Sequence, residues 1–174
     1  MTHVTHVAIP DAAPTPDSER RDSMGRLVSV TWLGAEVGLI DNSARWLVAV
    51  DGSACSLRAV AMVARLVAQA PRAEVDLVHV HSWLSKEAAE TELARCGWAA
   101  TAQARHLLDA AALRWHLYAV MGEAAAEIVG LAEALGSSSV AIGSRGLTAA
   151  ESVLLGSVAY TVVHRTRIPV LVVR

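Results

Sequence analysis

The chain has 174 residues, of which 53% are hydrophobic and 18% charged, with a formal net charge of −2. This composition is typical of a folded domain with a sizeable core and excludes a disordered chain. A charge so close to zero creates no field that would attract nucleic acid or an anionic membrane, so we predict neither as a partner. No uncharged apolar run reaches the roughly 20 residues of a spanning helix, and the N-terminus lacks the pattern of a signal peptide. We therefore expect a cytoplasmic protein, with Cys55 and Cys96 as free thiols.

The first 44 residues form an N-terminal extension in our prediction. Residues 1–25 are rich in Pro, Asp, Ser and Thr and predict a loose, partly disordered tail. The segment "RLVSVTW" places Val28, Val30 and Trp32 on one face at period two, which is compatible with a short extra strand. The extension could cover a pocket, add to a sheet edge or do neither, and the sequence leaves these alternatives open.

From residue 45 to residue 174, short apolar runs alternate with segments of helical periodicity, which indicates one domain. Buried strands are predicted at 46–50, 75–80, 115–121, 139–143 and 169–173. Helices are predicted at 55–70, at 86–113 with a break near Gly97, at 123–135 and at 156–165. This alternation predicts an α/β fold, a doubly wound five-stranded parallel sheet with helices on both faces. Ligands of such sheets bind beyond the carboxyl ends of the strands.

Two of the predicted strand ends carry candidate binding residues. Asp51 begins the loop "DGS" after the first strand, and the loop "GSRGLTAAESVLLGS" follows the fourth. Gly156 and Ser157 should start a helix, where free N–H groups and the helix dipole attract an anion. The Ser157 hydroxyl could donate to a phosphate or cap the helix. The loop is not a P-loop, because it lacks the Gly-Lys-Ser/Thr ending and Lys86 is the only lysine. It is not the GxGxxG dinucleotide fingerprint either, because the helix of that motif begins directly after the glycines. By spacing alone, phosphate binding and simple chain punctuation both stay open.

The segment "GSRGLTAAESVLLGSVAYTVVHRTRIPVLVV" resembles the nucleotide-binding end of the universal stress protein family, whose pattern is Gly-x2-Gly-x9-Gly-Ser/Thr. Gly143, Gly146, Gly156 and Ser157 match this pattern. The segment "VAVDGS" resembles the family's first strand and loop, "LVHV" its second strand, and "GEAAAEIV" its third-strand turn and helix. The resemblance therefore extends over about residues 45–174 and leaves the first 44 outside.

The resemblance implies an adenine nucleotide alpha hydrolase-like fold that binds ATP, with or without Mg²⁺, over the strand ends. Asp51 and Val80 would border the adenosine, and Ile142 and Gly143 would pass beneath it. The phosphates and ribose would be surrounded by Arg145, Gly146, Gly156, Ser157 and Val158. Ala159 stands where some nucleotide-binding members have a hydroxyl residue, which would remove one phosphate contact.

The resemblance also implies a homodimer that pairs through the last strand, from Pro169 to Val173. Such pairing would explain a strongly apolar strand at a sheet edge, which is otherwise an aggregation risk. The resulting hypothesis is a regulatory, ATP-binding module of the stress response. Slow ATP hydrolysis is the most we expect, since no water-activating base can be identified. A family member that binds no nucleotide is one alternative. An adenylyl- or phosphoryl-transfer enzyme is another, disfavoured because "DGSACS" does not match the Ser-Gly-Gly-x-Asp-Ser loop of related enzymes.

Other polar residues have structural explanations that we prefer, and we predict no catalytic residue and no metal ligand. His79 and His81 share a strand face near Asp76, but structural histidines are commoner than such metal sites. Ser53 is expected to cap a helix, because no nucleophile elbow surrounds it. Glu151 could hold a cation or be solvated. Arg145 could bind a phosphate bidentately or only cover the pocket.

Overall fold

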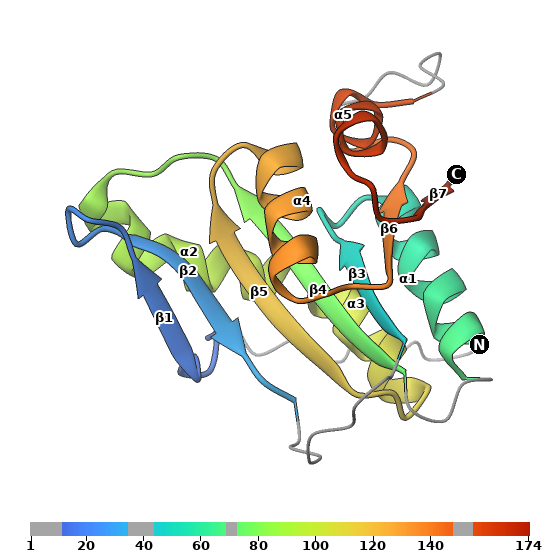
Figure 1. Cartoon of the computed structure of the whole chain (residues 1–174). Helices are drawn as coiled ribbons and strands as arrows, with labels where there is room; N and C mark the ends of the chain where they lie inside the picture. Colours follow the sequence, from blue (N-terminus) through green and yellow to red (C-terminus); the bar gives the residue numbers. More distant parts are fainter. Residues whose placement is uncertain (1–11, 35–43, 69–72, 148–154) are drawn as a thin grey trace.

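The computed structural model describes residues 12–34, 44–68, 73–147 and 155–174. They form one seven-stranded sheet in the order β1-β2-β5-β4-β3-β6-β7 (Figure 1). The strands are β1 (Ser18–Arg21), β2 (Leu27–Trp32), β3 (Arg45–Ala49), β4 (Glu74–His81), β5 (Trp115–Met121), β6 (Ser139–Gly143) and β7 (Val170–Val173). The helices are α1 (Ala54–Val67), α2 (Lys86–Ala100), α3 (Ala102–Ala110), α4 (Ala124–Ala134) and α5 (Ser157–Arg165).

The five strands from β3 to β7 are parallel, as predicted. The chain builds β4 and β5 to one side of β3, then returns to place β6 and β7 on the other side. The switch point therefore lies between β3 and β6. Loops leave these two neighbouring strands in opposite directions there, which opens a space for a ligand at their carboxyl ends.

The sheet has seven strands, so the prediction of five is wrong. Strand β2 pairs antiparallel with β5, and β1 pairs antiparallel with β2. The expectation of a loose tail is wrong for residues 18–21, which form β1. The sequence carries no signal for this strand, because its four residues are all exposed and show no apolar alternation. The described part of the extension thus adds to a sheet edge. Burial of Trp32, whose ring centroid lies 5.3 Å from that of Trp98, anchors it to α2.

Helices cover both faces of the sheet, as predicted. Helices α1, α2 and α3 pack on one face and α4 and α5 on the other, each with its own apolar cluster (Figure 1). The predicted break near Gly97 is misplaced, because α2 continues to Ala100 and the two helices meet at Thr101. Gly97 serves packing instead: a Cβ there would lie 2.4 Å from that of Ala119. Within the described ranges, no helix is long and apolar enough to cross a membrane.

An ionic network lies at the amino ends of β3, β4 and β5. Arg45 donates from Nε to Asp76 Oδ2 at 2.5 Å and from a terminal nitrogen to Oδ1 at 3.0 Å. His116 Nδ1 lies 3.2 Å from the same Oδ1, and Asp76 is fully buried. The hydrogen bond to Asp76 raises the pKa of Arg45, while burial and the nearby Asp76 charge raise the pKa of Tyr118 to about 12. The charges of this network are therefore satisfied within the protein.

Candidate functional site

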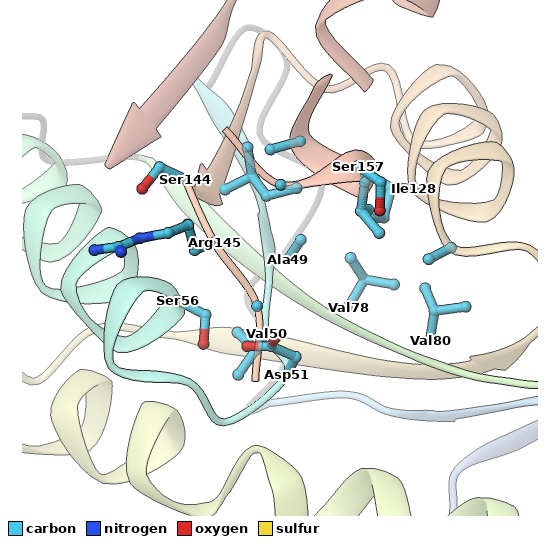
Figure 2. A pocket seen from close by; sticks show the side chains of 17 residues that line it. Ala49, Val50, Asp51, Ser56, Val78, Val80, Ile128, Ser144, Arg145 and Ser157 are labelled. Carbon is cyan, nitrogen blue, oxygen red and sulfur yellow. The ribbon is translucent and has the colours of Figure 1, made fainter. Parts of the chain in front are cut away.

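A pocket lies at the carboxyl ends of β3, β4 and β6, below the start of α5 (Figure 2). It brings together residues from three strands, from the loops that follow β3 and β6, and from helices α1, α4 and α5. Every residue that the sequence analysis placed around a nucleotide lines it, namely Asp51, Val80, Ile142, Gly143, Arg145, Gly146, Gly156, Ser157 and Val158. The parallel sheet explains this convergence, because all of its strands deliver their following loops to one edge.

Asp51 supplies the carboxylate of the pocket. Its Oδ1 accepts a hydrogen bond from the Ser53 N–H at 2.9 Å, and its Oδ2 accepts one from the Leu147 N–H at 3.2 Å. Burial alone would raise the pKa of Asp51, but hydrogen bonds from Ser53, Ser56 and the Leu147 N–H outweigh it and lower the pKa. Asp51 is therefore a charged acceptor at neutral pH.

Ser53 caps helix α1, as predicted. Its Oγ accepts a hydrogen bond from the Ser56 N–H at 3.2 Å, in the usual N-cap geometry. The same hydroxyl donates to the carbonyl of Arg145 at 3.3 Å. Ser53 itself does not line the pocket. It connects the loop after β3 to the loop after β6.

The three glycines of the motif differ in what requires them. A Cβ on Gly143 would lie 2.7 Å from Ser56 N and 2.8 Å from two atoms of Cys55, so α1 could not pack against the loop. A Cβ on Gly146 would lie 2.8 Å from Asp51 Oδ2. Gly156 is different: its φ is −70°, and a Cβ would meet its neighbours at 3.4 Å or more, which is ordinary contact. Packing among the described residues therefore accounts for Gly143 and Gly146 but not for Gly156.

Helix α5 presents its first turn to the pocket. Gly156 is the N-cap and carries no capping side chain, while its own N–H donates to the Ser144 carbonyl at 2.7 Å. Ser157 is the first helical residue, so the alternative in which its hydroxyl caps the helix is wrong. The N–H groups of Ser157, Val158 and Ala159 have no acceptor one turn earlier in the helix. No other acceptor for them occurs among the residues described here, and all three residues line the pocket.

Part of the pocket wall is apolar. Figure 2 shows Val78, Val80 and Ile128 on the same side of the pocket as Ser157, whereas the Arg145 side chain extends the other way, toward α1. The guanidinium of Arg145 is thus not aimed at the start of α5. The pocket combines an apolar wall, one carboxylate and a helix start with open N–H groups.

Some lining residues were not singled out from the sequence: Ala49, Val50, Ser56, Val78, Ala124 and Ile128. The period-two alternation of β4 could have identified Val78, because it shares a face with Val80. Ala124 and Ile128 belong to α4, and no local signal shows that this helix crosses over the end of β4. Their contribution depends on tertiary packing alone.

The histidines and acids considered for a metal site do not converge. His79 Nδ1 lies 2.9 Å from the Val50 carbonyl, and burial lowers the pKa of His79. His81 lies at the surface, and Asp76 points to the other sheet face, toward Arg45. In the part of the chain that the structure covers, no three potential metal ligands form a group, and both cysteines are free. Glu151 lies outside the described residues.

Comparison with solved structures reveals the same fold. The hypothetical protein MJ0577 is 26% identical, with a TM-score of 0.66 over 75% of this chain and 94% of its own. A universal stress protein in complex with cAMP is 25% identical, with a TM-score of 0.59 over 77% and 98%. The universal stress protein from Archaeoglobus fulgidus in complex with dAMP is 18% identical, with a TM-score of 0.59 over 78% and 100%, and supports the fold alone.

None of the curated proteins matches the chain significantly. A match to a family model covers residues 44–174, which include β3 to β7, all five helices and every lining residue of the pocket. The hairpin of β1 and β2 falls outside the match. Because the match covers well over half of the sequence, the chain belongs to the universal stress protein family.

Proposed function

We propose that this protein is a regulatory module that binds ATP, as its Mg²⁺ complex, in the pocket at the switch point of the sheet. The observation that carries the proposal is the open first turn of α5, which faces a pocket with an apolar wall. Two structural neighbours are described as complexes with the adenine nucleotides cAMP and dAMP. These complexes make an adenine nucleotide the natural class of ligand for the present pocket.

The apolar wall suits the base. Val80 and Ile142 line the pocket from β4 and β6, the two strands that flank β3. Val78 of β4 and Ile128 of α4 extend the apolar wall. An adenine ring placed there would lose its contact with water along both faces, which favours binding. The charged Asp51 lines the pocket and would accept a hydrogen bond from a ribose hydroxyl.

The start of α5 suits the phosphates. The N–H groups of Ser157 and Val158 and the positive end of the helix dipole would face the phosphate oxygens. Gly156 would let a phosphate approach the backbone, which gives a reason for the one glycine of the motif that packing among the described residues does not explain. Mg²⁺ carried by the phosphates would neutralise their charge, since Arg145 extends toward α1.

A regulatory role is favoured over a catalytic one. Asp51 is the only carboxylate among the described residues that line the pocket. Its lowered pKa makes it a poor general base, because a weak base accepts a proton from water inefficiently. We expect slow ATP hydrolysis at most.

We further propose that the output surface is the edge of the sheet at β7. Its four residues are apolar and only half-buried, and β7 is the terminal strand of the sheet. The carbonyls of Pro169 and Val173 face β6, so by alternation the hydrogen-bonding groups of Val170 and Val172 face outward. A second copy that pairs with this edge would form a homodimer.

Titration calorimetry with Mg-ATP tests the nucleotide proposal. Wild type should bind saturably, and Gly156→Trp should abolish binding by filling the space before α5. Gly130→Trp is the matched control, because Gly130 is an exposed position of α4 where a Cβ meets nothing within 4 Å. Wild type without heat or saturation at millimolar Mg-ATP would refute the proposal. Rapid release of AMP or pyrophosphate would favour the transfer enzyme instead.

A further inference from the structure

We infer that Ser53, which lies outside the pocket, is a positioning residue for residues 144–147, the described start of the loop after β6, which we call the glycine loop. Ser53 holds this glycine loop in its ligand-binding shape. The inference rests on the proposed function, because it concerns how the same pocket is organised. Ser53 belongs to the loop after β3, whereas Arg145 and Gly146 belong to the loop after β6. The two loops lie at the switch point, where the sheet itself provides no hydrogen bond between them.

The Ser53 hydroxyl both accepts and donates a hydrogen bond. As an acceptor it receives the Ser56 N–H, which starts α1, and as a donor it bonds to the Arg145 carbonyl. The neighbouring Asp51 carboxylate also accepts from this hydroxyl, so its one proton lies between Asp51 and the Arg145 carbonyl of the glycine loop. Ser53 is only 8% exposed, so water has little access to compete for either bond. One side chain thereby joins the start of α1 to the loop that lines the pocket.

A second connection lies beside the first. Asp51 receives the Ser53 N–H on one oxygen and the Leu147 N–H on the other. The missing Cβ of Gly146 lets this carboxylate approach the loop closely. Ser53 therefore acts on the glycine loop directly through its hydroxyl and indirectly through the orientation of Asp51.

The consequence concerns affinity. Residues 144–146 line the pocket, so a loop that is already fixed needs no ordering when a nucleotide binds. Loss of the hydroxyl would free the Arg145 carbonyl and return part of that ordering to the binding step, which weakens affinity. A net hydrogen bond contributes about 0.5–1.5 kcal/mol, which corresponds to a roughly three- to tenfold change in Kd.

Helix α2 provides a matched control. Ser85 caps it with the same geometry, since its Oγ accepts the Ala88 N–H at 3.1 Å. Ser85 does not line the pocket, and its side chain also hydrogen-bonds to Glu87 in the first turn of the same helix. Ser85→Ala therefore removes contacts within the start of α2 alone, whereas Ser53→Ala removes a cap together with the bond to the glycine loop.

The test compares Ser53→Ala, Ser53→Thr and Ser85→Ala with wild type in three measurements. Both alanine variants should lower the urea midpoint, Ser53→Ala by the larger amount because it loses the loop bond as well as the cap. Only Ser53→Ala should weaken Mg-ATP binding, by about three- to tenfold in Kd. Only Ser53→Ala should also speed hydrogen exchange at the Leu147 amide of the unliganded protein. Ser53→Thr, which keeps the hydroxyl, should restore both properties.

The inference is overturned if Ser53→Ala matches Ser85→Ala in both affinity and Leu147 exchange. It is also overturned if Ser53→Thr behaves like Ser53→Ala while remaining folded. If wild type does not bind Mg-ATP, the proposed function fails, and the exchange rate at Leu147 still decides whether Ser53 holds the loop.

Discussion

The two ends of the parallel sheet place polar residues in opposite situations. At the amino end, Arg45, Asp76 and His116 satisfy one another, and the buried carboxylate of Asp76 faces protein donors only. At the carboxyl end, the Asp51 carboxylate lines a pocket, and the first N–H groups of α5 face the same pocket. The polar groups at the amino end therefore stabilise the fold, whereas those at the carboxyl end are available to a ligand.

The largest expected effect is a loss of stability when the ionic network at the amino end is disrupted. Asp76→Asn should lower the free energy of unfolding by about 3 kcal/mol, because it leaves Arg45 without its buried partner. Urea unfolding measures this loss. Mg-ATP affinity of the folded variant should match wild type. A stability loss below about 0.5 kcal/mol, or a weakened pocket, would contradict the division between the two ends.

The next largest effect is expected at Gly143, where packing and the pocket meet. Gly143→Ala should cost about 1–3 kcal/mol of stability, because the new Cβ would contact the backbone of α1 at under 3 Å. Thermal unfolding in the absence of nucleotide measures this change. Wild-type stability in this variant would show that α1 and the loop can separate freely.

Gly156→Ala should weaken nucleotide binding while leaving the stability of the protein nearly unchanged. Its Cβ meets only ordinary contacts, so we expect a stability loss under about 1 kcal/mol. The methyl group would nevertheless occupy the space before the first turn of α5 and raise the Kd for Mg-ATP by at least about fivefold. Calorimetry on folded protein tests the affinity, and an unchanged Kd would argue that no phosphate approaches Gly156.

The smallest expected effect concerns pH and His79. Burial lowers its pKa below the ordinary value of 6.5, so the unfolded chain takes up the proton first as pH falls. Stability should therefore decrease as pH falls through 6.5 toward the lower pKa of the folded state, and then level off. In His79→Gln this contribution should be absent. Parallel stability curves of the two proteins between pH 7 and pH 5 would contradict the assignment.

The part of the fold that local patterns encode was predictable. Continuous apolar runs identified β3 to β7, and Ser53 marked the start of α1. Strand β1 was not predictable, because "SERR" is exposed on both faces and becomes a strand only by pairing with β2. The role of Gly97 was likewise not predictable, because its close approach to Ala119 is a contact between α2 and β5.

The candidate site was predictable where glycines and an acid follow strands. The motif located the glycine loop and the start of α5, and all residues named from it line one pocket. The direction of the Arg145 side chain and the hydrogen bond from Ser53 to its carbonyl depend on two loops meeting in space. The residue spacing within either loop therefore could not predict the direction of Arg145 or its contact with Ser53.

An NMR titration with Mg-ATP reports on both ends of the sheet in one experiment and shows whether the nucleotide binds at the carboxyl end alone. We predict saturable amide shifts that are largest at Gly143, Gly146, Ser157 and Val158. The amides of Asp76 and His116 should stay unchanged in the same experiment. The absence of saturable shifts, or shifts that are largest at the amino end, would contradict the account.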